Sequence, residues 1–162
     1  MPSSFLASRA AWLLVLSSLI VAPACGGDDD QSGDDLTYDC EDDQRDEAFI
    51  AGMKKVGVGG TEITLVSSTP APPQRGNNAW VIEVTRAGAP VEGAAMTVES
   101  FMPDHRHYAG IDPVITPGAT PGQYQVDPVK LWMPGLWEIT VETTAPGADA
   151  ADEVVFKFCI PS

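Results

Sequence analysis

The sequence predicts an all-β domain, a β-sandwich of about six to seven strands with one short helix on its N-terminal side. Three observations lead to this class. From residue 61 onward, apolar and polar residues alternate in short runs rich in β-branched and aromatic side chains. The 14 prolines and 15 glycines separate these runs and favour many turns over long helices. A length of 162 residues suits one compact domain.

Six segments alternate clearly enough to be predicted as strands. They cover residues 62–67, 79–86, 95–101, 123–129, 137–143 and 153–159. The expected core faces consist of Trp80, Ile82 and Val84 in the second strand and of Trp137, Ile139 and Val141 in the fifth. Residues 87–90 (AGAP) are predicted to form a hairpin-like turn. The proline-rich residues 69–73 are predicted to form a stiff connection outside any ladder.

The segment before the strands has the pattern of a short amphipathic helix. Residues 42–55 begin with acidic residues and end with two lysines, which suits the helix dipole. Phe49, Ile50 and Met53 are spaced so that they would lie on one side of that helix. Residues 57–60 (GVGG) are predicted to end it and to turn into the first strand. They lack the Lys-Ser/Thr pair of a phosphate-binding loop.

Residues 1–24 have the features of a signal peptide. Arg9 provides the positive charge, and residues 10–22 form an apolar stretch that is too short to cross a bilayer. The following Ala-Pro-Ala-Cys sequence resembles the lipobox of bacterial lipoproteins. It predicts acylation of Cys25 and anchoring to a bacterial membrane, on the periplasmic side or at the cell surface. The same residues also fit ordinary signal peptidase, which would leave Cys25 as a free first residue.

A strongly acidic segment follows Cys25, and the chain carries a formal net charge of −14. We interpret residues 25–41 as a solvated tether that holds the domain, residues 42–162, away from the membrane. The shortage of Lys and Arg argues against nucleic acid as a partner. An alternative interpretation of the acidic residues is a calcium loop of the EF-hand type, formed by Asp28, Asp30, Ser32, Gly33 and Asp39.

The cysteines support an exported protein. If Cys25 carries lipid, Cys40 and Cys159 remain as an even pair in an oxidising compartment, where a disulfide between them is expected. Such a bridge would close nearly the whole domain into one loop. The alternative is two unpaired thiols.

The chain offers little for catalysis but has one cluster of soft ligands. No Gly-x-Ser-x-Gly or His-Glu-x-x-His motif occurs, so we predict that the protein is not an enzyme. His105 and His107 are two residues apart, and in an extended segment they project to the same side. With the thioethers of Met102 and Met133 they would form a site suited to Cu(I). The alternative is that both methionines fill gaps in the core and that the histidines belong to a polar loop.

The same residues carry a resemblance to a family. The chain has Met-Pro-x-His-x-His at residues 102–107, Gly-x-Tyr at 122–124 and Met-Pro-Gly-x-Trp-x-Ile-x-Val at 133–141. Over residues 79–145 it resembles the YtkA-like domain, which is related to FixH-type envelope proteins. The resemblance implies an immunoglobulin-like sandwich outside the cytoplasm and a role in copper handling or oxidase assembly. The family usually has Gly between the two histidines, where this chain has Arg106.

Two functional hypotheses follow. In the first, a lipid-anchored sandwich binds Cu(I) through Met102, His105, His107 and Met133 and passes it to an envelope partner. In the second, the domain is a metal-free interaction module that packs its Met-Pro loops and tryptophans against another envelope protein.

Overall fold

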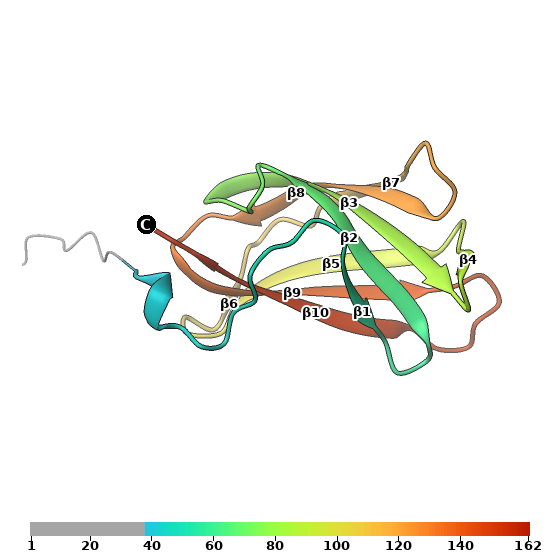
Figure 1. Cartoon of the computed structure of the whole chain (residues 1–162), viewed down its shortest axis with the longest axis horizontal. Coiled ribbons are helices and arrows are strands. Elements are labelled where there is room, and N and C mark those ends of the chain that lie inside the picture. Colours follow the sequence, from blue (N-terminus) through green and yellow to red (C-terminus); the bar gives the residue numbers. More distant parts are fainter. Residues whose placement is uncertain (1–37) are drawn as a thin grey trace, which may run out of the picture. The chain divides into compact units, whose positions relative to one another are not determined.

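The computed structural model describes residues 38–162, which form two antiparallel β-sheets packed face to face (Figure 1). The predicted signal peptide, the lipidation site at Cys25 and nearly all of the predicted tether and of the EF-hand-like sequence lie outside these residues. Within the described residues, no helix is long and apolar enough to cross a membrane.

Ten strands make up the sandwich. They are β1 (Met53–Val56), β2 (Thr61–Thr69), β3 (Gly76–Arg86), β4 (Ala89–Pro90), β5 (Ala95–Met102), β6 (His107–Tyr108), β7 (Val114–Pro117), β8 (Gln123–Leu131), β9 (Gly135–Thr144) and β10 (Asp152–Ile160). One sheet has the order β1-β2-β3-β8-β7, with β4 paired to β3, and the other has the order β10-β9-β5-β6. The all-β sandwich is therefore confirmed.

The six predicted strands correspond to β2, β3, β5, β8, β9 and β10. The core faces are also as predicted, because the inward side chains of β3 and β9 are fully buried. Trp80 lies at the centre, edge-to-face against Phe156 and Phe158 with ring centroids 6.3 and 5.9 Å apart. The predicted turn at 87–90 joins β3 to β4. Its central residues Ala87 and Gly88 have φ of 50° and 79°, as a two-residue hairpin of matching twist requires.

The predicted helix over residues 42–55 is wrong, and the described residues contain no α-helix. A single 3-10 turn, η1 (Cys40–Asp42), precedes an irregular segment that leads into β1. Met53 pairs with Leu65 across β1 and β2, Phe49 packs on Phe158, and Ile50 is 67% exposed. The three apolar side chains therefore separate instead of forming one helical face. Pairing with the sheet outweighs the weak local preference for helix.

The predicted disulfide between Cys40 and Cys159 is present, with Cα atoms 5.6 Å apart. It joins η1 to the end of β10, on the side of that strand opposite to the buried Phe158. The N-terminal segment is thereby fixed against the last strand of the domain.

The glycine-rich residues 57–60 form a turn, as predicted. The turn joins β1 to β2, and no α-helix precedes it in the described residues. The carboxylate of Asp152, 7% exposed, accepts hydrogen bonds from the backbone N–H of Gly59 at 2.5 Å and of Thr61 at 2.9 Å. A Cβ atom on Gly59 would lie 2.7 Å from this carboxylate, so the turn needs glycine there. Burial of Asp152 opposes ionisation, but the N–H donors of Thr61 and Gly59 outweigh it and lower its pKa.

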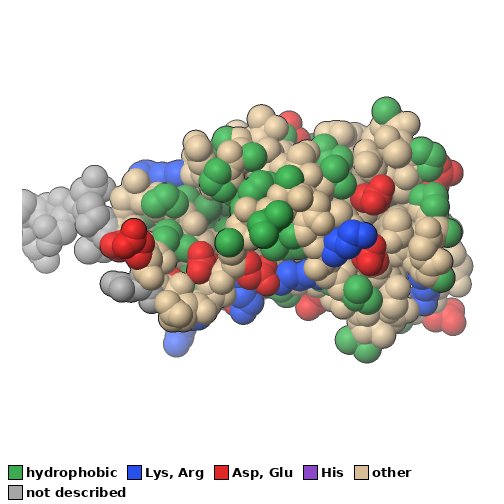
Figure 2. All heavy atoms as spheres, in the orientation of Figure 1, with side chains coloured by type: hydrophobic (Ala, Val, Ile, Leu, Met, Phe, Trp, Pro, Cys, Tyr) green, Lys and Arg blue, Asp and Glu red, His purple; other side chains and the backbone are tan. Residues whose placement is uncertain are grey.

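Charged side chains are interspersed on the face of the molecule that Figure 2 shows. Acidic and basic groups alternate there, and they are not gathered into a basic patch.

Candidate functional site

The predicted histidines lie on the turn between β5 and β6. Met102 is the last residue of β5 and pairs directly with His107, the first residue of β6. Directly opposed residues of antiparallel strands project to the same face of the sheet, so His107 lies on the inner face with Met102. The backbone N–H of Arg106 donates to the carbonyl of Met102 at 2.8 Å and closes the turn. Arg106 has a φ of 55°, a left-handed conformation that glycine adopts more readily than other residues.

The imidazole of His107 is held between two tryptophans. Its ring stacks on Trp132, with centroids 5.1 Å apart and an interplanar angle of 21°, and it lies edge-on to Trp137 at 6.0 Å. Nδ1 lies 3.2 Å from the carbonyl of Tyr108. Nε2 is buried and has no hydrogen-bond partner among the described residues. A buried polar atom without a partner is costly, so Nε2 is the atom of this turn that most needs a ligand.

Met102 is 1% exposed and lies beneath the start of β9. A Cβ atom on Gly135 would lie 2.5 Å from its terminal methyl group and 3.7 Å from the ring of Tyr38. A larger residue at position 135 would therefore displace the end of the Met102 side chain. Gly135 also has a φ of 122°, which is strained for other residues. Tyr38 lies above Gly135 and belongs to the N-terminal segment that the disulfide fixes.

The remaining two predicted ligands are His105 and Met133. His105 is exposed, and its ring centroid is 5.8 Å from that of His107. Met133, in the connection between β8 and β9, is partly buried against the core. Its carbonyl accepts a hydrogen bond of 2.9 Å from Nε1 of Trp137, the tryptophan that contacts His107. The fold thus places both histidines and Met102 at one turn, and it ties the backbone of Met133 to the same aromatic cluster.

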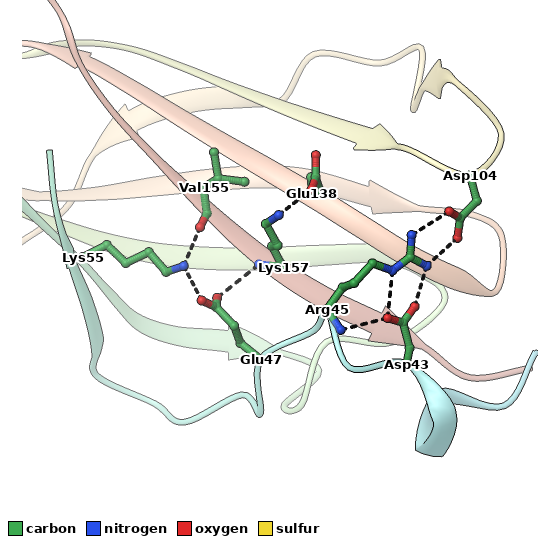
Figure 3. A network of polar contacts seen from close by, with 8 residues as sticks. All are labelled: Asp43, Arg45, Glu47, Lys55, Asp104, Glu138, Val155 and Lys157. Carbon is green, nitrogen blue, oxygen red and sulfur yellow. Dashed lines mark hydrogen bonds and ion pairs between the residues drawn. The ribbon is translucent and has the colours of Figure 1, made fainter. Parts of the chain in front are cut away.

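An ion-pair cluster holds the histidine turn to the N-terminal segment (Figure 3). The guanidinium of Arg45 donates to both carboxylate oxygens of Asp104, at 2.7 and 2.8 Å, and to the carboxylate of Asp43. Tyr38 donates to Asp43 at 2.8 Å. Hydrogen bonds from Arg45 lower the pKa of Asp43 and Asp104, so both carboxylates are ionised at neutral pH. Burial, followed by the contact with Asp43, raises the pKa of Tyr38.

Sequence reasoning did not foresee this cluster. Arg45 is the one base in the acidic stretch 28–47, and that isolation is the available signal of a specific partner. The partner itself, Asp104, is 59 residues away in sequence. Trp132 and Tyr38 were also missed as neighbours of the predicted ligands, because only the folded sandwich brings them to this end.

The side chains available as ligands limit the kind of metal that this turn could bind. Among residues 38–162, no group of three or more His, Cys, Asp or Glu side chains is placed to hold a metal ion. A metal at the histidine turn would therefore depend on thioether ligands beside the two imidazoles. Thioether and imidazole together favour Cu(I) over harder cations.

The fold and this turn define an antiparallel β-sandwich domain with histidine and methionine side chains at one end. Residues 55–142, more than half of the chain, match the family model described as YtkA-like, and the chain belongs to that family. No curated protein matches the sequence.

Two solved structures of FetP from uropathogenic Escherichia coli strain F11 are also similar. A copper-bound variant has 10% sequence identity and a TM-score of 0.47, over 68% of this chain and 95% of that one. FetP as isolated after expression in the periplasm has 10% identity and a TM-score of 0.46, over 70% and 97% of the two chains. Similarity at this level carries no conclusion about function.

Proposed function

We propose that this protein is a non-enzymatic, lipid-anchored component of a bacterial cell envelope whose YtkA-like domain binds Cu(I) at the end formed by the β5–β6 turn. The ligands are His105, His107, Met102 and Met133. The observation that carries the proposal is the buried, unpartnered Nε2 of His107, on the same sheet face as the thioether of Met102. The signal peptide and Cys25 support the location, and they rest on the sequence alone.

The spacing of the histidines fits a shared ion. With metal–nitrogen bonds of about 2.0–2.1 Å, two imidazoles on one ion have ring centroids roughly 5–6 Å apart. The centroids of His105 and His107 are 5.8 Å apart. The exposed His105 and the half-buried His107, whose Nε2 is buried, thus offer one ligand from the solvent side and one from the interior.

Competition titration with a chromogenic Cu(I) chelator tests the proposal. The full chain in detergent should bind one Cu(I), and the His105→Ala, His107→Ala double variant should bind at least 100-fold more weakly. Met102→Leu and Met133→Leu remove a thioether while nearly conserving volume, so they should fold and still weaken binding at least tenfold. Affinity should also be lower in acid, since protonated imidazole cannot ligate.

Met96→Leu is the matched control, because Met96 is a partly buried methionine on the same face of β5 and outside the turn. It should bind Cu(I) as the wild type does. Equal affinity of the wild type and the double-histidine variant would refute the site.

A second candidate function, a metal-free interaction module, is favoured by exposed aromatic rings beside the turn. Tyr108 is 61% exposed and Trp132 is 40% exposed. Large exposed aromatics of this kind are enriched at protein interfaces. If Trp132→Ala abolishes capture of an envelope partner and copper chelation leaves that capture unchanged, this function replaces the first.

A further inference from the structure

The two edges of the four-stranded sheet differ in how many of their outward backbone groups have hydrogen-bond partners. At the β10 edge, the carbonyl of Lys157 accepts a hydrogen bond of 2.8 Å from the N–H of Glu47, and the N–H of Lys157 donates to the carboxylate of Glu47 at 3.2 Å. The carbonyl of Val155 accepts from the ammonium of Lys55 (Figure 3). Glu47 and Lys55 thus satisfy three outward backbone groups in the middle of β10, the C=O of Val155 and the N–H and C=O of Lys157. This part of the edge is not free to pair with another chain.

No strand of residues 38–162 pairs with residues 95–99 at the β5 edge. β6 pairs only with the last two residues of β5, and the carbonyl of Ser100 accepts one further bond from the N–H of Ala109. The backbone C=O of Ser100 points away from β9, and the direction of the backbone groups alternates from one residue to the next along a strand. The N–H and C=O groups of Met96 and Val98, four and two residues before Ser100, therefore point away from β9 as well. No backbone hydrogen bond joins either residue to the connection between β6 and β7 within the described part of the chain.

A small acidic groove lies along this open stretch. It has a volume of about 190 Å³ and runs between residues 96–99 of β5 and Asp112, Pro113 and Ile115. Its two charged side chains are the carboxylates of Glu99 and Asp112, and neither has an ion pair or a side-chain hydrogen bond among the described residues. Small-molecule pockets usually measure about 300–1,000 Å³. This groove suits one or two residues of an extended segment, together with one long side chain, better than a cofactor.

We infer that the β5 edge is a docking site for an extended segment of another protein that carries a Lys or Arg. The segment adds as a strand to Met96 and Val98, and its basic side chain enters the groove between Glu99 and Asp112. Main-chain bonds to an open edge provide affinity in this mode of recognition, and pockets for alternate side chains provide specificity. The inference is independent of copper binding.

Charge disfavours two occupants that the chain itself could supply, the acidic stretch 28–47 and a second β5 edge. Residues 28–47 hold 11 acidic residues and one base, so this stretch would be repelled by Glu99 and Asp112. Antiparallel pairing of two β5 edges from two copies would place both Glu99 side chains on one face, where like charges destabilise a strand pair. A basic segment of a different protein removes both conflicts.

Fluorescence anisotropy with two labelled heptapeptides tests the inference on the full chain in detergent. One probe alternates Lys and Val, and the other alternates Glu and Val. The Lys probe should bind at least tenfold more tightly than the Glu probe. The Glu99→Gln, Asp112→Asn double variant should reduce its affinity at least tenfold, and Met96→Pro, which removes one outward N–H, should reduce it by a similar factor.

The matched control neutralises two exposed carboxylates elsewhere, Glu153→Gln on the opposite edge strand and Asp149→Asn in the β9–β10 loop. It should leave binding of the Lys probe unchanged, and hydrogen exchange should show protection by this probe confined to residues 96–99 and 109–115. No binding of the Lys probe overturns the inference. Equal loss of affinity in the control, or protection spread over other acidic surfaces, overturns it as well, because the attraction is then only net charge.

Discussion

The two ends of the sandwich are closed by different physical means. At the end with the β1–β2 turn, the buried carboxylate of Asp152 binds the backbone N–H groups of Gly59 and Thr61. At the opposite end, the histidine turn is held by Arg45 and Asp104, whose side chains are 49% and 35% exposed. Salt screens a buried hydrogen bond between a carboxylate and backbone N–H groups only weakly. It screens an exposed ion pair strongly.

This difference assigns different tasks to the two ends. At the Asp152 end, hydrogen bonds tie the β1–β2 hairpin to β10 and so join the two sheets. The histidine end combines a disulfide, an exposed ion-pair cluster and an unpartnered imidazole nitrogen. An end of that kind can be released locally while the sandwich stays folded. Both ends therefore contribute to stability, the histidine end mainly through its disulfide, but only the histidine end carries the proposed site.

The largest effect should come from removing the disulfide of the histidine end. In the Cys40→Ser, Cys159→Ser double variant, the free energy of unfolding should fall by about 4–5 kcal/mol, because the bridge closes a loop of more than 100 residues. Urea denaturation followed by tryptophan fluorescence measures the change. Wild type unfolded with a dithiol reductant should match the variant, and Cys25→Ser should match the oxidised wild type. An unchanged midpoint in the double variant would contradict the stabilising role.

A smaller effect is expected at the buried end. Asp152→Asn turns one acceptor oxygen into an N–H₂ group that faces a backbone donor, so the free energy of unfolding should fall by about 2–3 kcal/mol. Asp149→Asn is the control, since Asp149 is exposed in the adjoining loop. It should change stability by less than about 0.5 kcal/mol. Similar losses in the two variants would show that the hydrogen bonds of Asp152 contribute nothing specific.

Comparison of the wild type with Asp152→Asn also predicts how the stability difference between them changes with pH. The pKa of Asp152 is lower in the folded than in the unfolded state, so the folded state holds the ionised form preferentially. The stability that this carboxylate contributes is present above its unfolded pKa, about 3.9, and is lost as the pH falls through the folded value. The difference between wild type and Asp152→Asn should therefore be constant from pH 5 to 8 and shrink below pH 4. A difference that grows towards acid would reverse the assignment.

The strands of this fold could be predicted because they alternate strongly. β3 and β9 each bury one face fully and the other only partly, and that period of two is visible without tertiary information. The missed strands β1, β4, β6 and β7 have two to four residues each. Such segments are too short to show a period. The helix prediction failed because three apolar residues at helical spacing are weak evidence for a helix. The same residues can be used separately, as when Met53 enters a strand and Phe49 packs on Phe158.

The candidate site was only partly accessible from the sequence. The histidine pair and Met102 are close in the chain, so their proximity followed from local spacing. The contacts of His107 with Trp132 and of Gly135 with Met102 cross between distant segments, and no local pattern encodes them. The disulfide was predictable from another source, because export leaves an even pair of cysteines whatever the fold. Polar partners far apart in the chain, such as Arg45 and Asp104, produce no periodic pattern in the sequence from which they could be predicted.

The smallest effect on global stability should come from Arg45→Ala, although it acts on the histidine turn. Exposed ion pairs contribute little to unfolding, so the urea midpoint should stay near that of the wild type. Amide exchange in residues 103–108 should nevertheless accelerate several-fold, because Asp104 loses both of its bonds to the guanidinium. Arg45→Lys should give an intermediate rate, since a single ammonium cannot form the bidentate pair. In 1 M NaCl the wild-type rate should approach that of Arg45→Ala, while exchange in residues 57–61 should not change. Salt-independent exchange at the histidine turn would mean that both ends are held by equally unscreened contacts, and the contrast between them would disappear.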